Sequence, residues 1–166
     1  MINIKFARLN NKAIIPSKRD GDAGYDIYGV FDKDIKIIQP HETQLIPTGI
    51  ASAMGTDHYF QVEERGSTGS KGIKKSAGVI EGNYRGEWFV PITNTNDVPL
   101  IFFNDEKLCM DNSPLSEMGI VYPQSKAIAQ FVVLPVPKTN IEEISIEDLN
   151  KIESNRGTGA LGSTGK

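Results

Sequence analysis

Cysteine and histidine are both scarce in this chain of 166 residues. Cys109 is the single cysteine, so the chain has no internal disulfide and no cysteine-cluster metal site. His41 and His58 are the two histidines, and they lie too far apart in the sequence for a helical zinc pair, so we expect both at the surface. These counts exclude a disulfide framework and the common zinc sites.

Long apolar runs and an excess of positive charge are missing as well. No run approaches the ~20 residues that a membrane-spanning helix needs, and the first residues show no signal-peptide pattern. The formal net charge is −3, which argues against general nucleic-acid binding but not against a phosphate ligand held by a few arginines. With 39% hydrophobic and 23% charged residues, we expect a soluble, intracellular domain with a real core.

What the sequence does have is many short β-type segments separated by turn residues. Apolar residues that alternate or cluster between glycines and prolines predict strands near residues 2–6, 26–28, 35–37, 43–50, 58–62 and 127–134. No long helix is indicated, although residues 141–153 are compatible with a helical turn or an arm. An all-β barrel or sandwich follows from this pattern.

The segment from Gly78 to Trp88 predicts a β-hairpin. Gly82 and Asn83 form a two-residue turn that tolerates positive φ, and strand-forming residues flank it. Glu81 and Tyr84 would close the turn as a cross-strand pair, with Cβ atoms only ~5 Å apart on one face. Such a pair offers a base beside a flat ring. On this stretch alone, a solvated glutamate beside an ordinary turn is the simpler interpretation.

Two glycine- and hydroxyl-rich segments each begin with an arginine, at Arg65 and at Arg156. Glycines let backbone N–H groups converge on an anion, and arginine adds a forked donor matched to phosphate. Neither segment has the Gly-Lys-Ser/Thr ending of a Walker loop. Ordering the backbone of each residue in the second segment costs ~1–2 kcal/mol of conformational entropy. We therefore expect this segment to be either a disordered tail or a lid that becomes ordered when it binds a phosphate ligand.

Five segments, in this order, resemble the five motifs of the homotrimeric dUTPase family: Ala23 to Tyr28, Arg65 to Ser67, Gly78 to Gly86, Ile128 to Phe131, and Arg156 to Gly165. The connecting stretch Ile46 to Ile50 is also similar to the family. The resemblance covers nearly the whole chain apart from residues 95–124. Any one motif is modest evidence, but five in one order are highly specific.

The resemblance implies a jelly-roll-like β-barrel with a flexible glycine-rich C-terminal arm, assembled as a homotrimer with shared active sites. It implies hydrolysis of dUTP to dUMP and pyrophosphate, with water attacking the α-phosphorus and Mg²⁺ on the triphosphate. Phosphoryl transfer depends mostly on positioning and charge, so arginines, backbone nests and Mg²⁺ matter as much as the base. The expected location is the cytoplasm, or the host cytoplasm for a phage-encoded chain, with no membrane or nucleic-acid partner.

Carried over by position, the resemblance assigns a role to each motif. Glu81 takes the place of the water-activating base, and Tyr84 packs under the deoxyribose and excludes a 2′-hydroxyl. Asp26, the second catalytic residue, and Gln130 act near the metal through its waters. The other substrate-binding residues belong to the uracil side (Gly78, Val79, Ile80, Phe89), the phosphate side (Arg65, Gly66, Ser67) or the closing tail (Arg156, Gly157, Leu161, Gly162, Ser163, Thr164).

The chain departs from the family pattern at several of these positions. Glu81 replaces the usual aspartate, and Leu161 replaces the phenylalanine that stacks on uracil. Gly66 replaces a serine near the phosphates, and Lys126 and Ala127 replace the Asp-Arg that usually precedes Ile-Ala-Gln. These changes bear on the rate and on individual roles more than on the substrate class.

Relative to the shortest family members, residues 95–124 look like an insertion. We therefore expect a barrel domain over residues 1–140, containing this insertion, and an arm over residues 141–166. The apolar patch Leu100 to Phe103 is expected to pack on the barrel, with a protein-partner surface as the other interpretation.

Two alternative functions stay open. A related dCTP deaminase needs a glutamate further along the second hairpin strand, where this chain has Pro91 or a neighbour. A catalytically weak, regulatory nucleotide-binding trimer that signals through residues 95–124 is kept open by Glu81 and Leu161. Pyrophosphate release from dUTP, or its absence, separates these possibilities.

Overall fold

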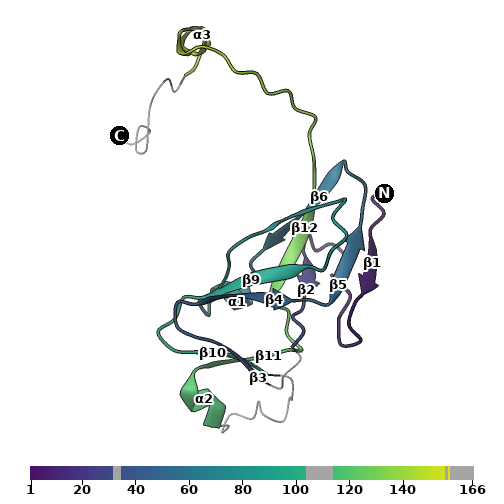
Figure 1. Cartoon of the computed structure of the whole chain (residues 1–166), viewed down its shortest axis with the longest axis vertical. Coiled ribbons are helices and arrows are strands. Elements are labelled where there is room, and N and C mark those ends of the chain that lie inside the picture. Colours follow the sequence, from purple (N-terminus) through teal and green to yellow (C-terminus); the bar gives the residue numbers. More distant parts are fainter. Residues whose placement is uncertain (32–34, 104–113, 156, 158–166) are drawn as a thin grey trace. The chain divides into compact units, whose positions relative to one another are not determined.

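The computed structural model describes residues 1–31, 35–103, 114–155 and 157. The chain divides into two compact units, Met1–Val136 and Pro137–Lys166. Strands make up most of the regular structure of the first unit, which confirms the expected all-β class (Figure 1). In the second unit the described regular element is one short helix, α3 (Ile146–Lys151), whose N-cap Ser145 accepts a hydrogen bond from the backbone N–H of Asp148.

The described strands of the first unit form four small sheets with the orders β1-β5, β11-β10-β3, β2-β12-β6-β8 and β4-β9-β7. The short helix α1 lies between β6 and β7 in the chain, and α2 lies between β10 and β11. The bounds are β1 (Lys5–Arg8), β2 (Tyr25–Ile27), β3 (Ile35–Ile38), β4 (Thr43–Pro47), β5 (Ile50–Ala53), β6 (His58–Glu63), α1 (Gly66–Gly69), β7 (Ile73–Lys75), β8 (Val79–Glu81), β9 (Phe89–Asn94), β10 (Leu100–Phe103), α2 (Pro114–Met118), β11 (Ile120–Pro123) and β12 (Ala129–Pro135).

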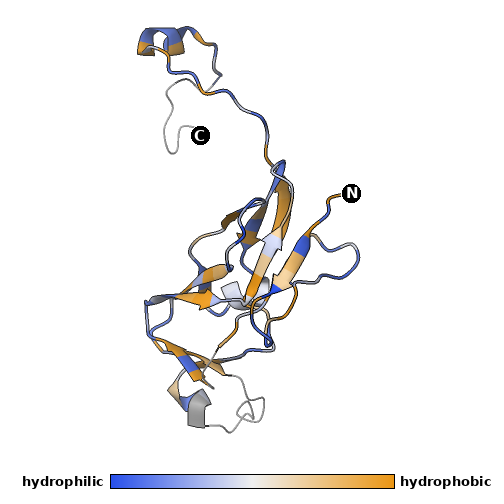
Figure 2. Cartoon of the chain, turned by 45° about the vertical axis from the view of Figure 1, so that its right-hand side comes forward, coloured by the Kyte–Doolittle hydropathy of each residue, from blue (hydrophilic) through white to orange (hydrophobic). Residues whose placement is uncertain are grey.

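Apolar residues concentrate on the strands and hydrophilic ones on the connecting loops (Figure 2). The centre of the core is a group of aromatic rings in which Phe60, Trp88 and Phe131 meet edge to face, with ring centroids 4.7–5.4 Å apart. Such pairs stabilise a core beyond the area that they bury. Each of the three side chains is fully buried. This cluster packs strands β6 and β12 of the sheet β2-β12-β6-β8 against Trp88.

The apolar patch Leu100 to Phe103 is strand β10, and all four of its residues are buried. It pairs antiparallel with β3 and parallel with β11. The expectation that this patch packs on the barrel is confirmed. The three strands lie side by side next to α2 in Figure 1.

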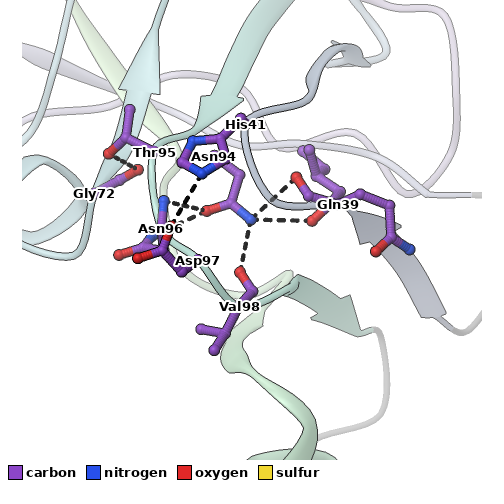
Figure 3. A network of polar contacts seen from close by, with 9 residues as sticks. Gln39, His41, Gly72, Asn94, Thr95, Asn96, Asp97 and Val98 are labelled. Carbon is purple, nitrogen blue, oxygen red and sulfur yellow. Dashed lines mark hydrogen bonds and ion pairs between the residues drawn. The ribbon is translucent and has the colours of Figure 1, made fainter.

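A buried amide ties the end of β9 to its neighbours (Figure 3). Asn94 is completely buried, and its Nδ2 group lies within hydrogen-bond distance of the carbonyl oxygens of Ile38, Gln39 and Val98, at 2.9–3.2 Å. Its Oδ1 atom accepts hydrogen bonds from the backbone and side-chain amides of Asn96. One side chain therefore holds together the end of β3, the end of β9 and the approach to β10.

The predicted hairpin is wrong, because β8 and β9 belong to different sheets. β8 pairs with β6, and β9 pairs with β4 and β7. The turn itself is present, since the N–H of Tyr84 donates to the carbonyl of Glu81 at 3.0 Å. However, neither Gly82 nor Asn83 has a positive φ. An unprimed turn of this kind splays the flanking strands instead of pairing them.

Two smaller expectations also need correction. The first strand is Lys5–Arg8 instead of residues 2–6, because its pairing with β5 sets its ends. His41 is exposed, as expected, with 67% of its side chain accessible, but only 22% of the His58 side chain is. His58 begins strand β6, where its neighbours cover it.

Candidate active site

A polar pocket of about 860 Å³ contains most of the residues assigned to the phosphates and the metal. Five segments form it: the loop before β2, strand β2 itself, the start of α1, and strands β6 and β12. Its lining includes the expected Asp26, Arg65, Gly66, Ser67 and Gln130, together with Ser17, Lys18, Arg19, Asp22, Ala23, Gly24, Glu63 and Val132.

The sheet register explains why three oxygen-bearing side chains meet in this pocket. Gln130 on the inner strand β12 lies opposite Asp26 on one side and Glu63 on the other. Directly opposed residues point to the same face of a sheet, so the three side chains form one row. Nε2 of Gln130 donates to the carbonyl of Glu64 at 2.8 Å, and Oε1 of Gln130 is the acceptor atom of the same amide.

Glycine is required at position 24 for this arrangement. A Cβ atom on Gly24 would lie only 2.3 Å from Oε1 of Gln130. The glycine of the first motif therefore makes room for the amide of the fourth. Within the described part of the chain, no group of three or more His, Cys, Asp or Glu residues could hold a metal by itself.

Arg65 is already heavily engaged within the pocket. Its Nε lies 2.9 Å from Oδ1 of Asp26, and one terminal nitrogen lies 3.4 Å from Oδ2 of the same carboxylate. The other terminal nitrogen donates to Oγ of Ser67 and to the carbonyl of Ala127, at 3.1 and 3.2 Å. A guanidinium has five N–H donors. Four are used by described residues, so one remains for a ligand unless Asp26 moves away.

Tyr122 also binds the carbonyl of Ala127, a contact that the sequence did not reveal. Its buried hydroxyl donates to the carbonyl of Ala127 at 2.7 Å, so Tyr122 and Arg65 share one acceptor. Burial raises the pKa of the Tyr122 phenol, with a smaller opposing effect from the Arg65 charge. Tyr122 falls in residues 95–124, the predicted insertion, where no periodic pattern in the sequence marks it.

Sequence reasoning also missed the two basic residues that precede β2. Lys18 and Arg19 line the polar pocket beside Asp22. Nζ of Lys18 donates to the carbonyl of Asp22 and lies 5.2 Å from the centre of the Tyr25 ring. With Arg65, the pocket therefore presents three cations and three carboxylates, a charge balance that favours neither ligand sign by itself.

A second, mainly apolar pocket of about 280 Å³ lies at β8 and the turn that follows it. It gathers the predicted base and most of the uracil-side residues: Val79, Ile80, Glu81, Tyr84 and Phe89, with Glu87 and Trp88. Gly78 lies just outside the lining, where its carbonyl accepts from the N–H of Val62 at 2.7 Å. Sequence reasoning missed Trp88, whose fully buried ring forms part of the pocket wall.

Side chains of the same segment hold the turn in shape. Arg85 donates from one terminal nitrogen to the carbonyls of Gly82 and Tyr84, at 2.8 and 3.0 Å, and reaches Ser52 at 3.3 Å. Glu87 accepts a hydrogen bond from the N–H of Gly49 through its carboxylate at 2.9 Å. The turn that carries the predicted base is thus fixed to β5 and to the β4–β5 connection.

The two pockets have no lining residue in common, and the sheet keeps them apart. Asp26 lies on β2 and Glu81 on β8, the two outer strands of the sheet β2-β12-β6-β8. On β6, the position level with Asp26 is Glu63 and the position level with Glu81 is Tyr59, four residues away. Three strand spacings and a four-residue offset separate them by roughly 14 Å across and 13 Å along the sheet, or about 20 Å in all.

The tail is described only in part. Gly157 adopts a left-handed conformation with φ of 55°, and its N–H donates to Oγ of Ser154 at 3.0 Å. The other predicted tail residues lie outside the described residues: Arg156, Leu161, Gly162, Ser163 and Thr164.

Comparisons with known proteins bear on the family and the fold. A family model described as dUTPase matches residues 10–109, more than half of the chain. The deoxyuridine 5′-triphosphate nucleotidohydrolase of Clostridioides difficile is 34% identical over 169 residues, which cover 99% of this chain and 99% of that protein.

Two solved phage structures are similar in fold. The Staphylococcus bacteriophage 80alpha dUTPase with dUPNHPP has a TM-score of 0.75 and 20% identity over 99% of each chain. A mutant dUTPase from phage phi11 of S. aureus, described with a structural Mg(II) ion, has a TM-score of 0.65 and 19% identity over 86% of this chain and 96% of that one. Within the described residues, no helix is long and apolar enough to span a membrane. On the family match and the full-length relative, this chain belongs to the dUTPase family.

Proposed function

We propose that the two pockets are halves of one active site, contributed by different copies of this chain, that hydrolyses dUTP to dUMP and pyrophosphate. The apolar half holds the nucleoside and carries the base. The polar half holds the triphosphate. The observation that supports this division is their separation of about 20 Å within one chain.

The polar half is suited to phosphates and a hydrated divalent cation. Arg65 supplies a fixed forked charge, and the backbone and hydroxyl of Ser67 add neutral donors. Asp26, Gln130 and Glu63 present oxygen atoms on one face, too few to encage a metal without water. This donor set fits Mg²⁺, which keeps several waters and is held by one or two carboxylates and the substrate phosphates. When bound there, Mg²⁺ neutralises charge that develops on the phosphates.

The apolar half supplies the base and the sugar contact. Glu81 is exposed at the end of β8, beside the mouth of the apolar pocket, where its carboxylate can accept a proton from a water molecule. Tyr84 offers a ring face to the deoxyribose, and Val79, Ile80 and Phe89 enclose the uracil. A packed ring against C2′ discriminates against a hydroxyl by sterics.

The shared site requires an oligomer. A base must lie within hydrogen-bond reach of the attacking water, and the water must reach the α-phosphorus. Arg65 binds the same triphosphate, so Glu81 and Arg65 must come within a few ångströms of one substrate. Two copies that meet along this sheet satisfy both demands, and a closed ring of three gives three such sites. The family resemblance assigns the tail residues Arg156, Ser163 and Thr164 to binding of the same triphosphate.

A steady-state assay of purified protein with Mg²⁺ and four nucleotides tests the activity. We expect pyrophosphate from dUTP and far less from dTTP, dCTP and UTP. Glu81→Gln should lose at least about a hundredfold in turnover while still binding a non-hydrolysable dUTP analogue, because the amide accepts no proton. Glu87→Gln is the matched control, since Glu87 lines the same pocket but its carboxylate binds Gly49. Ammonia from dCTP would indicate a deaminase, and binding without turnover would indicate the regulatory trimer.

A further inference from the structure

The ring of Tyr84 lies directly on the backbone of Gly86. A Cβ atom placed on Gly86 would meet the Tyr84 hydroxyl at 2.3 Å, Cζ at 2.6 Å and Cε2 at 3.0 Å, and these are its three nearest neighbours. The hydroxyl donates to the carbonyl of Glu87 at 3.1 Å, and the N–H of Tyr84 donates to Glu81. The ring is therefore folded back onto its own turn, with its hydroxyl bonded to Glu87 and its backbone bonded to Glu81.

We propose that Gly86 is a specificity-determining residue for the sugar, acting as the seat of the Tyr84 ring. The inference depends on the proposed contact between Tyr84 and the deoxyribose. Without a Cβ at position 86, the ring can lie flat against the turn, at the depth that leaves room for C2′ but not for a hydroxyl on it. With a Cβ there, the ring cannot occupy this position.

A larger residue at position 86 should displace the Tyr84 ring without disturbing the fold. Gly86 does not have a left-handed φ, so alanine can adopt its backbone conformation. Gly82, four residues earlier, is different, since its Cβ would meet the backbone carbonyls of Gly55 and His58 at 2.4 and 2.6 Å. The Tyr84 side chain can move, because it is 45% exposed and has solvent to rotate into. Gly86→Ala should therefore open the sugar site while the barrel stays folded.

The test is a double-mutant cycle read out as the ratio of kcat/KM for dUTP over that for UTP. We expect Gly86→Ala to lower this ratio about tenfold or more, the range that a single lost steric contact in a pocket produces. Tyr84→Ala should lower it similarly. Adding Gly86→Ala to Tyr84→Ala should change it less than about twofold, because two residues that act through one contact are not additive.

Each outcome of the cycle decides the inference. An unchanged ratio in Gly86→Ala, with Tyr84→Ala impaired, overturns the role of Gly86 and leaves that of Tyr84 intact. An unchanged ratio in Tyr84→Ala overturns both. If Gly86→Ala lowers the dUTP/UTP ratio equally in the wild type and in the Tyr84→Ala background, the role of Gly86 is also overturned. If Gly86→Ala alone does not fold, a folded double variant supports the ring contact, and an unfolded one overturns it.

Discussion

At the scale of single residues, Arg65 is the group on which the polar pocket depends. Asp26, Ser67 and the carbonyl of Ala127 hold its guanidinium in one orientation. Orientation in advance reduces the entropy that substrate binding has to overcome. Ala127, which replaces a family arginine, contacts Arg65 through its backbone carbonyl and not through its side chain.

Asp26→Asn should lower kcat/KM for dUTP by about a hundredfold, the size of loss that misplacement of a binding group causes. The amide keeps the shape of the carboxylate but loses its charge and replaces one of the two oxygens that pair with Arg65 by an NH₂ group. Steady-state kinetics over a range of Mg²⁺ concentrations measure the effect.

Asp22→Asn is the matched control, since Asp22 lines the same pocket and its backbone carbonyl, which binds Lys18, is unchanged. Equal losses in both variants would mean that the pocket needs negative charge in general. Asp26 would then have no special part.

Tyr122→Phe tests the support behind Arg65 through the pH dependence of stability. Because the folded-state pKa of Tyr122 is raised, the folded state holds the phenol proton more tightly than the unfolded state does. Its contribution to the free energy of unfolding is present below about pH 10, the pKa of a free tyrosine, and is lost as pH rises through the folded-state pKa. Urea unfolding between neutral and alkaline pH should show this decline in the wild type and less of it in the variant. Identical pH slopes in the two proteins would contradict the assignment.

Motif residues could be predicted from the sequence because their types carry the chemistry. Asp26, Arg65 and Gln130 do meet in one pocket, and Glu81 and Tyr84 do share another. Tyr122 and Lys18 could not be predicted in the same way. Their roles come from the packing of β11 and from a loop conformation, neither of which leaves a pattern in the sequence.

At the scale of elements, strand pairing decides where the base lies. Apolar runs between turn residues were sufficient to predict most strands, but they predicted the residues of β10 only as an apolar patch that packs on the barrel. The β8–β9 pairing failed because the turn at Gly82 and Asn83 has no positive φ, and only the fold determines that. Glu81 and Tyr84 are therefore neighbours across a turn instead of a cross-strand pair.

The buried amide of Asn94 should matter for stability more than its single side chain suggests. Asn94→Ala would leave the carbonyls of Ile38, Gln39 and Val98 without that donor, and each buried unsatisfied group costs about 1–3 kcal/mol. We expect a loss of about 3 kcal/mol in the free energy of unfolding, measured in urea. Thr95→Ala, which removes an exposed bond to Gly72, should cost under about 1 kcal/mol. Similar losses in both would mean that the Asn94 network adds nothing particular.

At the scale of the whole molecule, one sheet carries two incomplete sites on its opposite edges. The residues that we propose to bind one substrate lie about 20 Å apart within one chain, so on this proposal the site is complete only in an assembly of several copies. The sequence predicted the residues of both halves and, through the family resemblance, the sharing between copies. It could not predict the distance, because that depends on strand order, which no local pattern encodes.

The most direct test of the shared site mixes two inactive variants. Glu81→Gln and Arg65→Ala damage different halves, so each homotrimer should be inactive. Co-expression with two different tags allows trimers that contain both chains to be isolated. In such a trimer, roughly one site in three combines an intact Glu81 half with an intact Arg65 half. We therefore expect pyrophosphate release from dUTP at about a third of the wild-type rate per trimer. Mixed trimers as inactive as the two parents would show that one chain builds the whole site and would contradict this account.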